Sequence, residues 1–471
     1  MVKNVTLAGS QNGLRIKSWG RPSNGFAKDI LSQHIAMNNV QNPIVIDQNY
    51  CHENKDCPGQ VTSVLNDLRI TVIPLEDVKL TYRNGPADDI VIHFTGSSYQ
   101  ASNVVYNVVK LGAKPDGKID STEAFKKAWT LACSSTWPAM VYVPKGSFLI
   151  KPVVFGGPCK NKILFSIDGT IVAPSNYWVF GNSGFWILFY KVTGVTVYGG
   201  TIDAKGGSFW ACRNAGKNCP PGARSMSFVA SSNIMVTRLT SINSQMFHIS
   251  IHQCHNITLE NMKISAPSWS PNTDGIHMQS STGISITNSM IKTGDDCISI
   301  GPGSKNLRIH RIVCGPGHGI SIGSLALHQN EDGVENVKVT SVVFMGTQNG
   351  VRIKSWGRPS TGYARNIVFE NIIMKYVYNP IIIDQNYCPS AKGCPKHSSG
   401  VKISGVTYKN IKGTSATQLA MNFVCSSSNP CKGLILEDIN LTYYKKSGAA
   451  TSFCKNANGS KKGVVIPPSC L

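Results

Sequence analysis

Two short stretches, "NIMVTRLTSIN" at Asn233–Asn243 and "NITLENMKIS" at Asn256–Ser265, are built on the same plan. In each, asparagine precedes an alternation of apolar and polar residues that is rich in Ile, Val and Thr, which is typical of β-strands. Units of the same kind begin about 23 to 30 residues apart, the spacing of solenoid coils, at Asn233, Asn256, Gly283, Asn306, Asn336 and Asn366.

Strands that recur at one dominant period, with no helix-length segments between them, predict an all-β parallel β-helix. A β-sandwich is the alternative, but it would not explain the single period.

The segment "DSTEAFKKAWTLAC" at Asp120–Cys133 differs from these units because its apolar residues recur at helical spacing. An open solenoid end exposes unpaired backbone groups and has to be covered. We expect a short capping helix here, with Asp120 as its N-cap and Glu123 three residues later. Its apolar face is predicted to contain Ala124, Phe125, Ala128, Trp129 and Leu131.

A second, larger repeat divides the chain. "QNGLRIKSWGRPSNG" at residues 11–25 returns almost unchanged as "QNGVRIKSWGRPSTG" at residues 348–362, and "NPIVIDQNYC" at residues 42–51 returns as "NPIIIDQNYC". Residues 1–100 are therefore predicted to be a truncated, non-catalytic duplicate of the C-terminal half plus a linker. Residues 101–471 form the predicted β-helix domain.

The chain has 471 residues and a formal net charge of +21. Such a charge indicates either a solvated basic surface or an anionic partner, which could be nucleic acid, a membrane surface or an acidic polysaccharide. No Lys/Arg-rich run resembles a nucleic-acid arm, and no apolar stretch is long enough to cross a bilayer. We expect neither nucleic acid nor a membrane as partner.

The 15 cysteines indicate an oxidising compartment because most of them form close pairs in the sequence. Zinc binding is the alternative, but the usual CxxC pairs are absent. The first residues, "MVKNVTLAGSQNG", lack the apolar core of a signal peptide, which conflicts with secretion. Cys254 is left over after the candidate pairs Cys51/Cys57, Cys133/Cys159, Cys212/Cys219, Cys297/Cys314, Cys388/Cys394, Cys425/Cys431 and Cys454/Cys470.

Ionisable residues recur at coil spacing. Asp274, the pair Asp295 and Asp296, and His318 follow one another at about one coil each, and residues one coil apart stack roughly 4.8 Å from each other. Arg352 lies about one longer coil further on. Lys354 stands two residues after it, so both side chains can leave the strand on the same side.

Carboxylates held close together raise the pKa of one of them, which leaves a protonated acid beside an ionised base. That arrangement can protonate a leaving oxygen while a second carboxylate activates water. Taken alone, an Asp-Asp pair is more often a solvated turn or a calcium ligand, and a histidine in a glycine-rich loop is more often structural. Their common spacing favours a catalytic site instead. We expect this site to need neither a metal nor another cofactor.

The motifs "NTDG", "GDD", "GHG" and "RIK", in this order on a predicted β-helix, resemble the polygalacturonases of glycoside hydrolase family 28, and the surrounding residues are similar to the plant members. The resemblance covers about residues 104–471. It implies a right-handed, single-stranded parallel β-helix of the pectin lyase-like type. It also implies inverting hydrolysis of α-1,4-galacturonosyl linkages in pectate (homogalacturonan), with secretion to the cell wall.

The resemblance also implies the role of each residue. Asp295 would be the general acid, while Asp274 and Asp296 would activate water. His318 would orient the acid, and Cys297 would pair with Cys314. Expected substrate contacts are Arg352 and Lys354 to the galacturonate carboxylate, Tyr387 in "DQNYC", and Asn272 in the cleft.

Some questions stay open at this level. Neighbours on a regular strand face opposite sides, so Asp295 and Asp296 need a bend, which Gly294 is placed to provide. Endo-acting cleavage by a monomer is expected, and exo-acting cleavage is the alternative. A calcium-dependent pectate lyase and an inactive pectin-binding fusion protein are the rival functions. The earlier copy keeps Arg15, Lys17 and Tyr50 but has no acidic motif before them.

Overall fold

The computed structural model describes residues 2–19, 26–27, 32–38, 40, 42–50, 69–70, 75–82, 85–86, 93–95, 104–389, 393–445 and 448–471. The chain divides into two compact units, Met1–Ser102 and Asn103–Leu471. Within the described residues, no helix has the length and apolar character needed to span a membrane.

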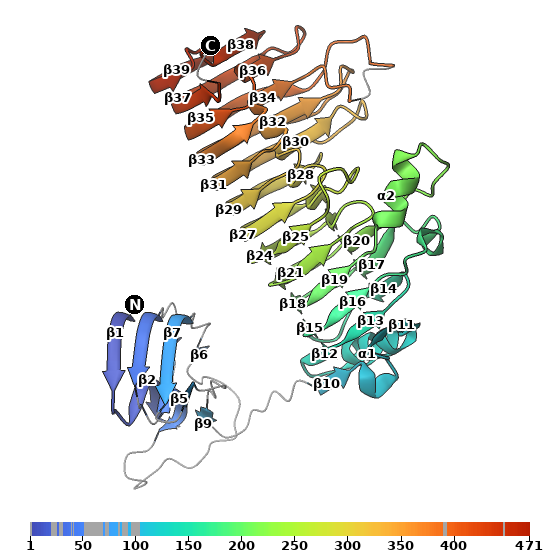
Figure 1. Ribbon diagram of the computed structural model, residues 1–471, viewed down its shortest axis with the longest axis vertical. Helices are drawn as coiled ribbons and strands as arrows, with labels where there is room; N and C mark the ends of the chain where they lie inside the picture. The colour runs from blue at the N-terminus through green and yellow to red at the C-terminus, as the bar shows by residue number, and fades with distance from the viewer. Residues whose placement is uncertain are drawn as a thin grey trace. The chain divides into compact units, whose positions relative to one another are not determined.

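The second unit is a stack of coils formed by two parallel sheets, one of 19 and one of 11 strands (Figure 1). The right-handed parallel β-helix predicted from the sequence is confirmed. The larger sheet contains β10 Val104–Asn107, β11 Asp116–Asp120, β12 Ala139–Val143, β13 Ser147–Leu149, β15 Ile163–Ile167, β16 Thr170–Val172, β18 Val195–Tyr198, β19 Thr201–Asp203, β21 Ser232–Thr237, β22 Thr240–Ile242, β24 His255–Glu260, β25 Lys263–Ser265, β27 Thr282–Lys292, β29 Lys305–Cys314, β31 Val334–Met345, β33 Tyr363–Val377, β35 Lys402–Ser415, β37 Cys431–Tyr443 and β39 Ala457–Ile466. The smaller sheet contains β14 Val153–Gly156, β17 Phe185–Tyr190, β20 Arg224–Val229, β23 Ile249–His252, β26 Ile276–Gln279, β28 Ile298–Ile300, β30 Ile320–Leu325, β32 Asn349–Ser355, β34 Asn379–Asp384, β36 Leu419–Val424 and β38 Thr451–Lys455. The helical segments are α1 Thr122–Ser134, α2 Gly207–Asn214 and the 3-10 turns η2 Val109–Leu111 and η3 Tyr177–Phe180.

The period-two alternation explains how the coils fill their interior. In register, Ile276, Ile298, Ile320, Val351 and Ile381 lie one above the other, and all five are fully buried. Each buried aliphatic side chain of this kind contributes about 1.5–3 kcal/mol through the hydrophobic effect. The next position in each strand faces outward and forms a separate row, which carries polar residues near the site.

The asparagines that begin the repeat units have a structural role. Asn233, Asn256, Asn306 and Asn336 all adopt the left-handed conformation, with φ between 53° and 56°, and Gly283 takes the intervening position with φ 70°. Asparagine and glycine tolerate this conformation best. The asparagine amides also bond from coil to coil, as in Asn256 Nδ2 to Asn233 Oδ1 at 2.7 Å.

The predicted helix is α1, and it packs against β10, β12 and β14 at the first coils (Figure 1). Its N-cap is Ser121, not Asp120 as predicted. The Asp120 carboxylate still accepts a hydrogen bond from the Thr122 N–H at 3.0 Å, so it satisfies a first-turn donor from one position earlier. Leu131 is only half-buried, and Ala132 completes the buried face with Phe125 and Trp129 among others.

Six of the predicted cysteine pairs are disulfides, which excludes zinc for those residues: Cys133–Cys159, Cys212–Cys219, Cys297–Cys314, Cys388–Cys394, Cys425–Cys431 and Cys454–Cys470. Cys254 is a buried free thiol, as expected. The predicted pair Cys51/Cys57 lies outside the described residues.

In the first unit, parallel pairing also dominates. Its described strands form the sheets β1 Val2–Ala8, β4 Ser32–Asn38, β7 Leu75–Tyr82 and β8 Gly85–Pro86; β2 Asn12–Trp19, β5 Asn42–Tyr50 and β9 His93–Thr95; and β3 Phe26–Ala27 with β6 Arg69–Ile70. Met37 and Val40 form a small buried cluster there.

Candidate active site

The two adjacent carboxylates lie in the turn between β27 and β28, where regular strand alternation does not apply. The chain bends at Gly294 and Asp295. A Cβ atom on Gly294 would stand 2.0 Å from the Ser270 carbonyl oxygen, so only glycine allows this close approach. The bend lets Asp295 and Asp296 contribute to one site.

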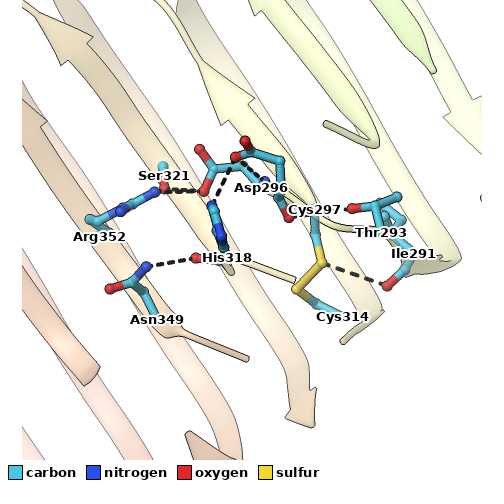
Figure 2. The surroundings of a disulfide bond; sticks show 10 residues. Ile291, Thr293, Asp296, Cys297, Cys314, His318, Ser321, Asn349 and Arg352 are labelled. Carbon is cyan, nitrogen blue, oxygen red and sulfur yellow. Dashed lines mark hydrogen bonds and ion pairs between the residues drawn. A yellow bond between two sulfur atoms is a disulfide. The ribbon is translucent and has the colours of Figure 1, made fainter. Parts of the chain in front are cut away.

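Asp295 is held by the next coil. Its Oδ1 lies 3.0 Å from Nδ1 of His318, and its carbonyl oxygen accepts a hydrogen bond from the His318 N–H at 2.7 Å. The Cys297–Cys314 disulfide links the same two turns (Figure 2). The Asn349 amide donates to the His318 carbonyl oxygen at 3.1 Å, which fixes the histidine turn from the following coil. The Asp295 side chain is 18% exposed, so its carboxylate can reach a ligand.

Asp296 is the buried member of the pair and receives three donors. Ser321 Oγ and Arg352 Nη2 donate to Oδ1 at 2.7 and 2.8 Å, and Lys354 Nζ donates to Oδ2 at 2.9 Å. Figure 2 shows Ser321 and Arg352 directed at this carboxylate. Burial raises the pKa of the Asp296 carboxyl, but Lys354 and Arg352 outweigh burial and lower that pKa to about 2.

Asp274 has the opposite electrostatic environment. Burial raises the pKa of its carboxyl well above the usual range, and the negative charges of Asp295 and Asp296 raise it further. Ser299 Oγ donates to Asp274 Oδ2 at 2.6 Å, which lowers that pKa in part. The site thus pairs a carboxylate that stays ionised with one that holds a proton more tightly.

A histidine completes this hydrogen-bond chain. Nδ1 of His277 lies 2.8 Å from Ser299 Oγ. While Asp274 is ionised, Ser299 donates its one proton to Asp274, and the His277 tautomer with its proton on Nδ1 can then donate to Ser299. Burial lowers the pKa of His277 to about 4, so the ring is neutral above that pH.

Arg352 and Lys354 lie on one face of β32, as predicted, and both are buried. Both cations lie near the aromatic ring of Tyr387. The centre of that ring is 5.9 Å from the guanidinium carbon of Arg352 and 5.1 Å from Nζ of Lys354. In this structure the two cations neutralise Asp296, so a substrate carboxylate would have to share them.

Asn272 stands apart from this network. It is exposed, and its Oδ1 accepts a hydrogen bond of 3.4 Å from Arg213 Nη2 of α2. The structure places it in the turn that leads to Asp274 and in contact with α2.

Asp295, Asp296 and His318 each offer one oxygen or nitrogen atom within 4.8 Å of the others. Among the described residues, this is the group whose spacing could hold a metal ion. The donor set does not fit a divalent ion, because both Asp296 oxygens already accept from cationic side chains. Those two cations would repel a further positive charge.

The sequence reading missed Ser299, Ser321 and His277. All three occupy the outward row that also contains Arg352, since His277 pairs with Ser299, Ser299 with Ser321, and Ser321 with Arg352. The repeated words "CISIG" and "GISIG" are the signal that could have found the two serines, because they place a serine at the same position of successive strands.

The profile of Glycosyl hydrolases family 28 matches residues 1–128 and 133–465. A polygalacturonase of Prunus persica is 55% identical over 384 residues, which cover 81% of this chain and 97% of that protein. An exopolygalacturonase of Platanus acerifolia is 43% identical over 372 residues, covering 78% of this chain and 98% of that protein.

Solved structures share the fold. An exopolygalacturonase from Thermotoga maritima matches with a TM-score of 0.64 and 20% identity, over 77% of this chain and 91% of that one. An endo-xylogalacturonan hydrolase from Aspergillus tubingensis matches with a TM-score of 0.68 and 21% identity, over 77% of this chain and 100% of that one.

Proposed function

The chain belongs to family 28 of the glycosyl hydrolases, and from that premise we propose that its three-carboxylate site hydrolyses α-1,4-galacturonosyl bonds of pectate by an inverting mechanism. The chain is a glycoside hydrolase of the polygalacturonase type. The observation that carries the mechanism is that the three carboxyls have different partners: Asp295 lies beside His318, Asp296 accepts from Arg352 and Lys354, and Asp274 accepts from Ser299. An accessible acid beside carboxylates that can hold a water is the arrangement that inverting hydrolysis of a glycosidic bond needs.

Asp295 is the general acid of this proposal. It is the most accessible of the three carboxyls, and His318 orients it. Its proton passes to the glycosidic oxygen as the bond from that oxygen to the anomeric carbon breaks. Water attacks the anomeric carbon from the opposite face, and its proton passes to a carboxylate base.

Asp274 is the better proton acceptor of the remaining two. Asp296, with a pKa of about 2, binds a proton too weakly to remove one from water efficiently. We assign Asp296 the task of holding Arg352 and Lys354 in place and of orienting the water.

Arg352, Lys354 and Tyr387 form the proposed subsite for the galacturonate at the cleavage point. The substrate carboxylate would take part of the hydrogen bonding that Asp296 now receives, with Arg352 able to offer a two-pronged contact. Asn272 stays a proposed contact at the margin of the cleft.

The test is incubation of the purified chain with polygalacturonate. Reducing ends should appear without the ultraviolet absorbance of unsaturated uronides, and chelation should not stop the reaction. Absorbing products would instead indicate a lyase. If neither reducing ends nor absorbing products appear while pectate still binds, the inactive pectin-binding alternative holds.

We propose endo-acting cleavage, with exo-acting cleavage as the alternative, since the relatives include both a polygalacturonase at 55% identity and an exopolygalacturonase at 43%. A time course of product sizes tests this. Oligomers of mixed length at early times support endo action, and release of single residues from the start supports exo action.

Secretion to the cell wall, a monomeric state and a non-catalytic first unit complete the proposal. The six disulfides of the described residues support secretion, because such bonds persist in oxidising compartments. The acidic motifs all lie in the second unit, which supports a non-catalytic role for the first.

A further inference from the structure

A basic cavity of about 390 Å³ lies at the ends of strands β30 and β32, beside the segment that follows β34. His328, Arg358 and His397 line it, and all three are exposed. The lining residues that the structure describes include no Asp or Glu. The cavity therefore presents donors and positive charge to whatever enters it.

The walls of this cavity are tied together by hydrogen bonds. The backbone N–H groups of Ala326, Leu327 and His328 donate to the Glu331 carboxylate at 2.7, 2.9 and 3.3 Å. The Thr361 N–H donates to the Gln329 carbonyl oxygen at 2.8 Å. This bond joins the wall formed by residues 326–329 to the wall formed by residues 358–359.

The third wall contains Pro395 and His397. Shortly after it, the Gly400 N–H donates to the Arg358 carbonyl oxygen at 2.8 Å, which joins this segment to the second wall. The cavity is preformed, and a ligand need not pay for ordering these loops.

A chain of ring contacts connects the cavity to the active site. The Arg358 guanidinium lies 5.1 Å from the centre of the Trp356 ring, and Trp356 contacts Tyr387 edge to face at 5.5 Å. Tyr387 in turn lies 5.1 Å from Lys354 Nζ. The cavity thus borders the subsite proposed for the galacturonate at the cleavage point.

We propose that this cavity binds the carboxylate of a second uronate residue of the same polysaccharide, with Arg358 as its main ligand. The inference rests on the proposed function, because it takes the chain held at Arg352 and Lys354 to be a polyuronate. A guanidinium recognises a carboxylate by two parallel hydrogen bonds, and stacking on Trp356 holds it in position. A free carboxylate, and not its methyl ester, is the group that this cavity selects.

The experiment measures binding of trigalacturonate and hexagalacturonate to the Asp295→Asn protein by calorimetry, so that no ligand is cleaved. Without further change, the hexamer should bind more tightly than the trimer. The gain from length is the ratio of the trimer's dissociation constant to that of the hexamer. In the Arg358→Gln background this ratio should fall about tenfold, which corresponds to the loss of one charge-assisted hydrogen bond. His397→Gln is the second variant, with a smaller loss in the same direction.

Arg238→Gln is the matched control. Arg238 is also an exposed arginine over an aromatic ring, 5.9 Å from the centre of Tyr198, on earlier coils and away from the cavity. It removes the same charge and should leave the gain from length unchanged.

An equal loss in the Arg358→Gln and Arg238→Gln proteins would overturn the inference and indicate general electrostatic attraction. An unchanged gain from length in both cavity variants would also overturn it. If the protein without any substitution neither binds nor cleaves an oligogalacturonate, the proposed function itself fails, which is a different outcome.

Discussion

The two copies of the "RIKSW" segment, in β2 and in β32, are paired with their next strand in the same register but differ in their surroundings. Arg15 lies opposite Val45 and Lys17 opposite Asp47, just as Arg352 lies opposite Ile382 and Lys354 opposite Asp384. Yet Arg15 is exposed, while Arg352 is 8% exposed.

The difference comes from what precedes each strand. β32 lies between β30 and β34, whereas β2 is the first strand of its three-stranded sheet in the described part of the first unit. The coils before β32 supply Ser321 and Asp296, and these side chains turn Arg352 toward the acids. The same segment thus acquires a chemical role only when the acidic coils are stacked beneath it.

The largest expected effect is that of Asp295→Asn. Loss of the general acid should reduce kcat by about 10²–10⁴-fold, with pectate binding retained. Because the first unit has no acidic motif, it should supply no residual activity. Reducing-end assays on the full chain, with binding measured in parallel, check this. Activity close to that of the parent would refute the assignment of the acid.

A matched pair of substitutions tests the two copies directly. Arg352→Gln should lower kcat/KM by about a hundredfold and destabilise the fold by about 3 kcal/mol, because a buried partner of Asp296 is removed. Arg15→Gln should change neither quantity. Kinetics and denaturant unfolding of both proteins decide the matter. Equal effects would show that the copies contribute alike.

Ser299→Ala tests the support beneath Asp274. The Ser299 hydroxyl lowers the pKa of Asp274, so its removal should raise that pKa further. A base with a higher pKa becomes ionised only at higher pH, and the rising acidic limb of kcat/KM should move upward by about half to one pH unit.

Ser299→Thr is the control for that profile, because it keeps a hydroxyl and should restore the position of the limb. Identical shifts in the Ala and Thr proteins would instead indicate altered packing. His277→Gln should displace the limb in the same direction as Ser299→Ala by a smaller amount, since it acts through Ser299.

The smallest expected effect is that of deleting residues 1–100. Activity on polygalacturonate should be unchanged, since every residue of the proposed site belongs to the second unit. Specific activity and thermal unfolding of the two proteins are compared. A large loss of activity would show that the first unit supports the site in some way.

The sequence by itself determined the coils and most of their chemistry. The asparagines that open most units, the period-two alternation and the close cysteine pairs are local signals, because each depends on residues within one coil or a few. Coil spacing also predicted that one of the two adjacent aspartates would meet His318, since stacking in a solenoid follows directly from the period. The spacing of two residues between Arg352 and Lys354 predicted that they would share a face.

Only the tertiary structure decided how each of these groups behaves. It pairs both cations with Asp296 and leaves Asp274 with a hydrogen bond from the Ser299 hydroxyl. It also places the helix N-cap at Ser121. The physical reason is that a pKa depends on burial and on charges within a few ångströms, and these come from three different coils. Turn lengths and side-chain directions set the distances between these charges. The residue pattern along one coil does not determine those distances.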